Sequence, residues 1–205
     1  MVKKLNPIIN TNICIVSICA VAVLAMVSGF RVPAFQQKPV AKVIDAQDTF
    51  PVPKRNPKQL FYLQRSANTN TIVYEINEDA KGQLIKDEPV LVYWLRYAED
   101  GAKKELNYIQ RVFAYGIKTE KITDTSYEMH INSYKKKLLY LTRHKADNKY
   151  HIFSIINAKL AILKRVFIRI DPGGSFWKPN VIYIEMKGID VATGKEAMER
   201  FKVAA

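Results

Sequence analysis

The chain has 205 residues, a formal net charge of +13 and only two cysteines. Both of them, Cys14 and Cys19, lie in an apolar stretch near the N-terminus, so the rest of the chain can form no disulfide, thiolate metal site or cysteine nucleophile. Such a charge would suit a nucleic-acid-binding protein, but the N-terminal stretch directs the residues after it out of the cytoplasm, and no nucleic-acid-binding motif is present. We therefore expect an exported protein that does not bind nucleic acid.

Residues 1–30 have the layout of a secretory signal peptide or of a membrane anchor with its N-terminus inside. Lys3 and Lys4 precede an apolar run from Ile13 to Val27. This run matches the core of a signal peptide, and with its flanks it approaches the length of about 20 residues that a transmembrane helix needs. Cleavage and a retained anchor both stay open. Either one places the remainder in the periplasm or on the outer side of a membrane.

Residues 31–57 are predicted to be a tether, because five prolines fall within them. Proline removes backbone donors and favours extended chain. Residues 58–205 are long enough for one domain with a sizeable core.

The pattern of this domain is mostly that of strands. Tyr127, Met129 and Ile131 alternate with polar residues, which is typical of a half-buried strand. Turn signals separate further β-rich segments, and one segment at 103–114 has helical spacing instead. We expect a mainly β fold of about eight or nine strands with one helix near 103–114. Because sequential strands joined by short turns pair antiparallel, an antiparallel β-sandwich is favoured, with a closed β-barrel as the alternative.

The stretch from Phe61 to Glu75 is unusual for its polar residues between two β runs. Asn and Ser shape turns through hydrogen bonds to nearby backbone, so a structural turn is one interpretation. The other is a polar cluster around Arg65, with Asn68 and Asn70, that holds an anionic or sugar-like ligand.

Residues 135–169 hold ten basic residues and one acidic residue, a local net charge of +9. A hairpin here would place these charges on neighbouring strands, and such a basic face would attract lipid headgroups, acidic glycans or an acidic protein. The alternative is a solvated face that aids solubility. The predicted basic surface comprises Lys135, Lys136, Lys137, Arg143, Lys145, Lys164, Arg165 and Arg169.

Residues that carry out chemistry are sparse. His144 and His151 would face each other across a two-residue turn at Asp147 and Asn148, and a turn of four residues is the alternative. Two ligands are too few for a metal, and we expect no acid close in sequence to complete the set. A carboxylate pair for glycoside chemistry could come from Glu75, Glu128 and Glu185. The favoured alternative is that these three glutamates are outward polar positions of amphipathic strands. We expect no catalytic residue, metal site or cofactor.

The segment 171–180 is a long loop with two large aromatic residues, Phe176 and Trp177. They either fold back onto the core or project as a contact site.

Three segments resemble the signature of a bacterial family, domain of unknown function 4833. They are FYLQRSANTNTIVYE (61–75), PVLVYWLRY (89–97) and AYGI (114–117). The resemblance covers about residues 58–203 and implies an exported or envelope location. It implies no activity, cofactor or catalytic residue. It does imply that Arg65, Asn68, Asn70, Tyr74, Trp94 and Tyr115 form a shared framework or pocket.

The sequence therefore favours a non-enzymatic, envelope-associated domain that binds a ligand or partner. We expect a groove near Arg65 and Trp94, with Trp177 as a further contact, and a separate basic face at 135–169. Two alternatives stay open. One is a hydrolase that acts on envelope glycan, and the other is a structural assembly subunit.

Overall fold

The computed structural model describes residues 50–175 and 178–202. The predicted signal peptide or anchor, most of the predicted tether and Trp177 lie outside this range. In the part of the chain that is described, no helix is long and apolar enough to cross a bilayer.

The described residues form eleven strands and one short π-helix. These elements are β1 (Gln59–Arg65), β2 (Asn68–Ile76), β3 (Val90–Leu95), β4 (Lys103–Glu105), the π-helix η2 (Gln110–Tyr115), β5 (Ile117–Thr123), β6 (Ser126–Ile131), β7 (Tyr134–Arg143), β8 (Tyr150–Ile156), β9 (Lys159–Asp171), β10 (Asn180–Asp190) and β11 (Glu196–Phe201).

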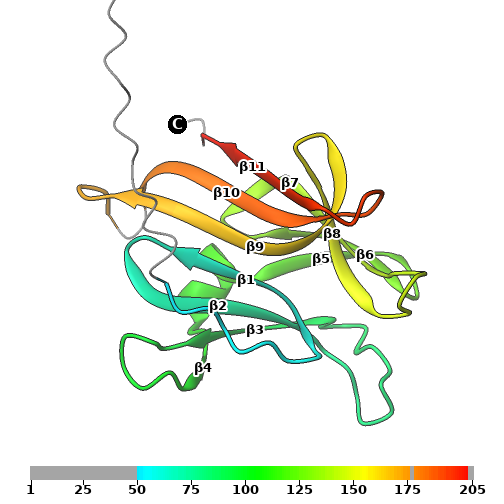
Figure 1. Cartoon of the computed structure of the whole chain (residues 1–205). Coiled ribbons are helices and arrows are strands. Elements are labelled where there is room, and N and C mark those ends of the chain that lie inside the picture. Colours follow the sequence, from blue (N-terminus) through cyan, green and yellow to red (C-terminus); the bar gives the residue numbers. More distant parts are fainter. Residues whose placement is uncertain (1–49, 176–177, 203–205) are drawn as a thin grey trace, which may run out of the picture. The chain divides into compact units, whose positions relative to one another are not determined.

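The strands belong to one hydrogen-bonded sheet with a branch at β9. The main order is β4-β3-β2-β1-β9-β8-β7-β6-β5, and β10 pairs with both β9 and β11 (Figure 1). Neighbouring strands are antiparallel except for β1 and β9, which are parallel. The first part of β9 pairs with β8 and its second part with β1, so this one strand joins the two halves of the sheet.

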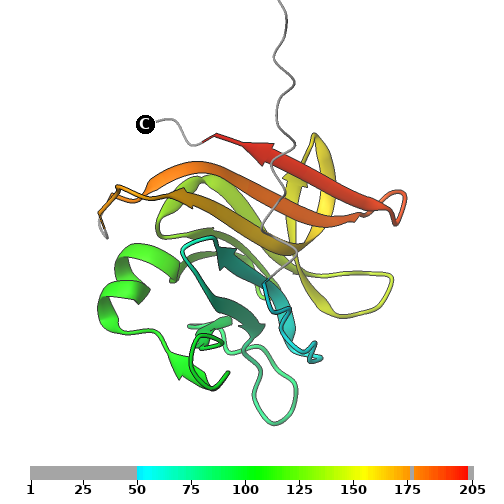
Figure 2. The same ribbon diagram turned by 60° about the vertical axis from the view of Figure 1, so that its left-hand side comes forward.

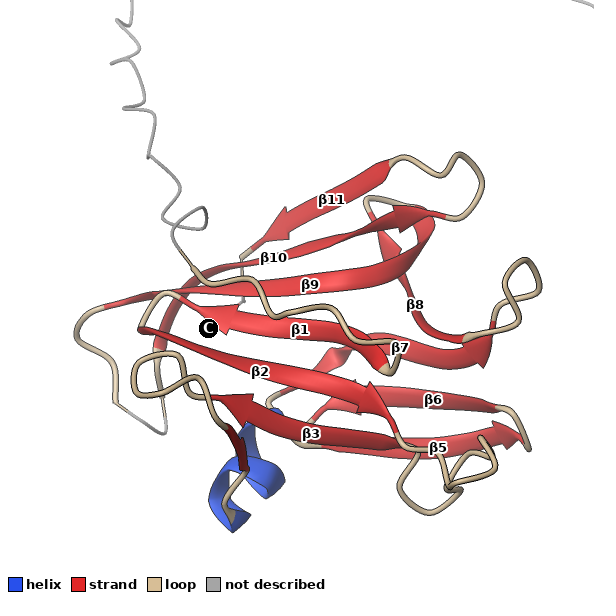
Figure 3. Ribbon diagram, turned by 60° about the horizontal axis from the view of Figure 1, so that its bottom comes forward, coloured by secondary structure: helices blue, strands red, loops and turns tan. Residues whose placement is uncertain are grey.

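The sheet curls into an open half-barrel, with β1–β3 in front of β5–β7 in the view of Figure 3. Its end strands, β4 and β5, do not pair with each other, so the barrel is not closed. Buried side chains from both halves, such as Tyr74 on β2 and Leu141 on β7, belong to one core cluster. The mainly β, largely antiparallel fold expected from the sequence is confirmed.

The alternation predicted for residues 127–131 is present in β6. Tyr127, Met129 and Ile131 are buried, whereas Glu128 and His130 between them are half-buried. Because successive side chains of a strand point to opposite faces, this pattern turns one face of β6 toward the core.

The predicted helix at 103–114 is present only in its second half. Lys103–Glu105 form the edge strand β4 instead and pair with Tyr93–Leu95 of β3. Leu106 is buried, and the Asn107 side chain accepts a hydrogen bond from the backbone of Gln110, which caps the turn that starts η2. The helical turn projects from the side of the sheet in Figure 2.

The last part of the predicted tether packs against the domain. The Phe50 ring lies 5.7 Å from that of Phe167, and Gln64 Nε2 donates to the carbonyl of Pro51 at 2.9 Å. Asn56 donates to the buried carboxylate of Glu75. Residues 50–57 therefore contribute to the packing of the domain.

Candidate functional site

An apolar groove opens between β7 and the β10–β11 hairpin. Several lining residues are spaced two apart on adjacent strands and so share one face of the sheet. They include Ile184 and Met186 of β10 and Val166 and Ile168 of β9. The complete lining is Leu63, Ile131, Ser133, Tyr134, Lys137, Leu139, Val166, Ile168, Ile184, Met186 and Phe201. Lys137 carries the only charge among these described residues.

Lys137 lies at the rim of the groove and is held there by a partner on β11. Its Nζ donates to Glu199 Oε2 at 2.9 Å and lies 5.4 Å from the centre of the Phe201 ring. The Tyr134 ring stacks on Phe201 at 5.8 Å. These contacts tie β7 to β11 across the groove.

The Glu199 carboxylate also receives a backbone donor, the N–H of Asn157, at 3.2 Å. Partial burial acts to raise the pKa of Glu199, but the hydrogen bonds from Lys137 and Asn157 outweigh it and lower the pKa. The charged form of Glu199 is therefore the one that holds the rim together.

The aromatic and arginine residues implied by the family resemblance do come together, but around a closed cluster. The guanidinium of Arg65 lies 5.1 Å from the Trp94 ring centre and 5.2 Å from that of Tyr115, and it donates to the Tyr115 hydroxyl. Tyr74 donates to the carbonyl of Tyr115 at 3.0 Å, and Trp94 donates to the side chain of Gln110 at 3.1 Å. We call Arg65, Trp94 and Tyr115 the arginine clamp.

The arginine clamp is a packing device between β1, β3 and η2. Trp94 and Tyr115 are buried and Arg65 is half-buried. Burial raises the pKa of Tyr115 while the nearby Arg65 acts in the opposite direction, so the hydroxyl stays protonated at neutral pH. The side chains of Arg65, Trp94 and Tyr115 do not line the apolar groove. The groove expected near Arg65 and Trp94 stays a prediction.

Asn68 and Asn70 shape loops. The side chain of Asn68 accepts from the backbone of Asn70, and that of Asn70 accepts from the backbone of Ala98 at 2.9 Å. These contacts fit the structural interpretation of the polar stretch. Trp177 lies outside the described residues.

The residues of the predicted basic surface come from β7, the turn after it and β9. Lys135, Lys136 and Lys137 lie at the start of β7, whereas Arg143 ends the strand, about 20–26 Å away at 3.3 Å per residue, and Lys145 lies in the turn beyond it. The remaining members, Lys164, Arg165 and Arg169, lie along β9. Lys164 interacts electrostatically with Asp147 of the turn after β7, so charges from β9 come near those at the end of β7. One continuous basic face at 135–169 stays a prediction.

The three glutamates considered for glycoside chemistry occupy separate surroundings. Glu75 on β2 accepts from Tyr93 and Asn56, and Glu185 on β10 is paired with Arg200 at 2.8 Å. Glu128 lies on β6, on the other half of the sheet. No contact brings these described carboxylates together, so they offer no acid–base pair for a hydrolase.

A second groove offers two adjacent carboxylates, Asp87 and Glu88, on the loop before β3. Glu88 is ion-paired with Arg111 at 3.1 Å, and both side chains are largely exposed. Such a surface pair lacks the enclosed surroundings that tune a catalytic acid.

The turn between β7 and β8 has four residues, which was the alternative to the two-residue turn. The backbone N–H of His144 donates to Lys149, and that of Asn148 donates to His144. His151 consequently pairs with Thr142, and His144 lies diagonal to it on the same face. The expectation that no nearby acid joins these histidines was wrong, because the turn brings Asp147 to both of them.

Several apolar side chains are exposed on the segment that contains η2. Such a surface is relevant to the alternative that the protein is a structural assembly subunit. Tyr108 is 76% exposed, and Ile109, Val112 and Phe113 are also exposed. These side chains offer an apolar surface, but nothing in the described structure indicates what would cover it.

Sequence reasoning missed the apolar groove because its lining comes from six separate segments. The inward positions of β7 and β10 are visible as alternating apolar residues. What the sequence does not give is that β10 and β11 fold over β7, since that depends on the branch at β9.

Comparison with known proteins supports the family and nothing finer. No curated protein and no solved structure matches the chain. The family described as a domain of unknown function, DUF4833, matches residues 61–200, about two thirds of the chain and nearly all of the described domain. The match includes β2, β3, the arginine clamp and most of the groove. The chain therefore belongs to the DUF4833 family.

Proposed function

We propose that this protein is an exported, non-enzymatic binding module for an anionic amphiphile of the cell envelope. The apolar part of the ligand lies in the groove between β7 and the β10–β11 hairpin. Its anionic head lies at the rim, beside Lys135 and Lys136. The observation that carries this proposal is an open groove lined almost entirely by apolar side chains.

The position of the lysines supports an anionic head. Lys135 and Lys136 are exposed and lie between Tyr134 and Lys137, two residues that line the groove. Lys137 is already paired with Glu199, so the two neighbouring lysines supply the charge available to a ligand. A cation at the mouth of an apolar groove favours an amphiphile over a neutral oil.

The composition of the lining favours binding over catalysis. The groove contains no carboxylate and no histidine. Its polar groups are one serine, one tyrosine and the paired Lys137. A hydrolase needs an acid or base that can act on the substrate, and the lysine of this lining is held by Glu199.

The proposal is tested by titrating the purified protein with decyl phosphate below its micellar concentration, followed by calorimetry. Tyr134→Ala removes a ring that lines the groove and stacks on Phe201, and is expected to weaken binding about fivefold, since an aromatic contact contributes about 1 kcal/mol. Tyr108→Ala is the matched control, because Tyr108 is exposed on a different part of the chain. Equal affinity of the two variants would contradict the groove as the binding site.

A comparison of two double variants tests whether Lys135 and Lys136 bind the anionic head of the ligand. The double variant Lys135→Gln/Lys136→Gln and the double variant Lys145→Gln/Lys149→Gln remove the same charge from opposite ends of β7. The first is expected to weaken decyl phosphate binding and to leave binding of the neutral decyl maltoside unchanged. If both double variants weaken binding equally, the effect is one of net charge, and the rim has no specific role.

A further inference from the structure

The turn between β7 and β8 gathers three side chains that commonly bind metal ions. His144 ends the β7 side of the turn, Asp147 lies within it, and His151 follows on β8. One ligand atom from each, two imidazole nitrogens and one carboxylate oxygen, lies within 4.8 Å of the others. This cluster lies at the opposite end of β7 from the rim of the groove and is independent of the proposed function.

The distances within the cluster are close to those of a metal site. His151 Nε2 lies 2.7 Å from Asp147 Oδ2, and His144 Nδ1 lies 3.6 Å from Asp147 Oδ1. An ion about 2.1 Å from each ligand holds neighbouring ligand atoms roughly 3–3.5 Å apart. The three ligand atoms lie within 4.8 Å of one another, so an ion would draw the imidazoles closer together and rotate the exposed Asp147 side chain.

The rings are held in place before any ion binds. His144 and His151 lie 5.7 Å apart at a steep angle, and both contact the buried ring of Phe153 at 5.7 and 6.3 Å. The turn itself is fixed by two backbone hydrogen bonds and by the bond from the backbone of Lys149 to Asp147 Oδ1 at 3.1 Å. The three ligands therefore converge without a large loss of conformational freedom on binding.

We propose that His144, Asp147 and His151 form a binding site for a divalent transition-metal ion of the zinc class. Two imidazoles and one carboxylate form one face of the coordination sphere. The remaining positions face solvent, where water or a group from a partner completes them.

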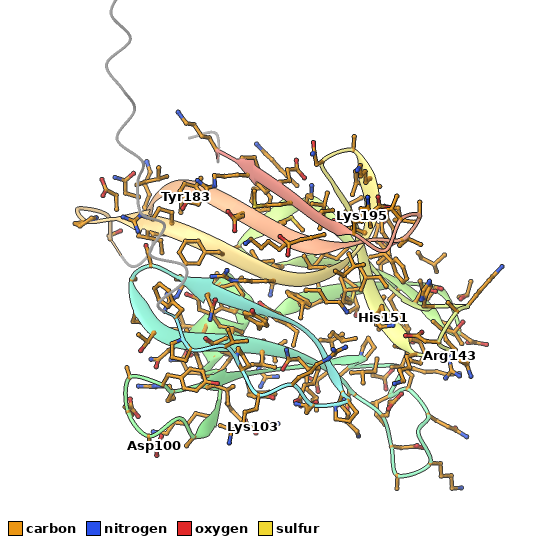
Figure 4. All side chains as sticks on the ribbon, in the orientation of Figure 1. Asp100, Lys103, Arg143, His151, Tyr183 and Lys195 are labelled. Carbon is orange, nitrogen blue, oxygen red and sulfur yellow. The ribbon has the colours of Figure 1, made fainter. Side chains whose placement is uncertain are left out.

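The surrounding charges restrict which ion can bind. Lys145 and Lys149 flank the cluster in sequence, and the half-buried Lys164 is close enough to Asp147 to interact electrostatically with it. Arg143 interacts instead with Asn148 at 3.4 Å and with the Tyr150 ring at 4.9 Å. In Figure 4, Arg143 and His151 lie at the same end of the domain, far from Tyr183. Hard ions such as Ca²⁺, which need several anionic oxygens, are thereby disfavoured, and an ion with strong affinity for imidazole is favoured.

The test is a calorimetric titration of the untagged protein with Zn²⁺, because the chain has only three histidines and a histidine tag would obscure the site. The expected result is saturation at one ion per chain. Each of His144→Gln, His151→Gln and Asp147→Asn is expected to weaken binding at least about tenfold, the smallest loss seen when even an outer partner of a metal ligand is removed.

His130→Gln is the matched control, since His130 lies on β6 outside the cluster. It is expected to keep the wild-type affinity. X-ray absorption of the Zn²⁺-loaded protein adds an independent measurement, with nitrogen and oxygen neighbours at about 2.0–2.1 Å. The proposal is overturned if no ion binds, if the three variants bind as the wild type does, or if His130→Gln loses as much affinity as they do.

Discussion

Arg65 and Lys137 both rest against aromatic rings, and their surroundings give them different roles. Arg65 is held between Trp94 and Tyr115, both of which are buried, and its hydrogen-bond partner is the Tyr115 hydroxyl. Lys137 rests on Phe201 at the rim of an open groove, and its partner is the carboxylate of Glu199. The same kind of contact thus closes a packed cluster in one place and frames an opening in the other.

The difference between these two places shows that a cation next to aromatic residues does not by itself indicate a ligand-binding groove. Trp94 and Tyr115 both lie against Arg65, so the cluster joins β1, β3 and η2. Around Lys137, the β10–β11 hairpin lies over β7 without filling the gap between them. We therefore expect changes at the arginine clamp to act mainly on stability, and changes at the groove to act mainly on binding.

The largest effect is expected from Arg65→Ala. This substitution removes two cation–aromatic contacts and leaves the half-enclosed Tyr115 hydroxyl without its donor, so unfolding should cost about 3 kcal/mol less. Urea unfolding followed by circular dichroism measures this change.

Arg111→Ala is the control for the loss of an arginine, because Arg111 makes an exposed ion pair with Glu88. It is expected to cost less than about 1 kcal/mol. If the two variants lose equal stability, the arginine clamp is not a packing element, and the contrast with Lys137 fails.

A smaller effect is expected from Gly116→Ala, which disturbs the clamp from the backbone. A Cβ at Gly116 would meet the carbonyl oxygen of Arg111 at 2.0 Å, where η2 packs closely against the start of β5. Relieving such an overlap moves the backbone next to Tyr115 and should cost about 2 kcal/mol.

Gly82→Ala serves as the comparison for Gly116→Ala, since nothing lies within 4 Å of a Cβ placed there, although its positive φ carries a strain of its own. The expected signature of Gly116→Ala is a change in the near-ultraviolet circular dichroism of the clamp aromatics. An unchanged aromatic signal together with full stability would show that the backbone at Gly116 adapts without disturbing the clamp.

Local features of this fold were predictable from the sequence, and features that depend on strand order were not. The alternation of Tyr127, Met129 and Ile131 placed β6 correctly, because a period of two is set by the strand itself. The apolar groove depends on β10 and β11 lying over β7, which is set by pairings between residues far apart in the chain.

The candidate metal ligands were not predicted as a group because the length of the turn between β7 and β8 was uncertain. His144 and His151 are recognisable in the sequence, but the role of Asp147 depends on the length of the turn. Asp147 belongs to the turn in either case. In the four-residue turn of the structure, its carboxylate lies near both imidazoles. Turn length sets the register of the hairpin and thereby decides which side chains meet.

The smallest effect concerns the rim of the groove and depends on pH. The pKa of Glu199 is lowered in the folded protein, so its stabilising effect is fully present above its ordinary value near 4.5 and is lost as pH falls through the folded value. Glu199→Gln should therefore reduce stability by about 0.5–1 kcal/mol at pH 7, because the pair with Lys137 is partly exposed. The two proteins should converge in stability as pH falls through the lowered pKa of Glu199. Urea unfolding at several pH values measures the difference in stability between the wild type and Glu199→Gln.

Glu196→Gln, an exposed change on the same strand, is the control and should show no such convergence. If the difference for Glu199→Gln persists at low pH, the charge of Glu199 does not hold the rim.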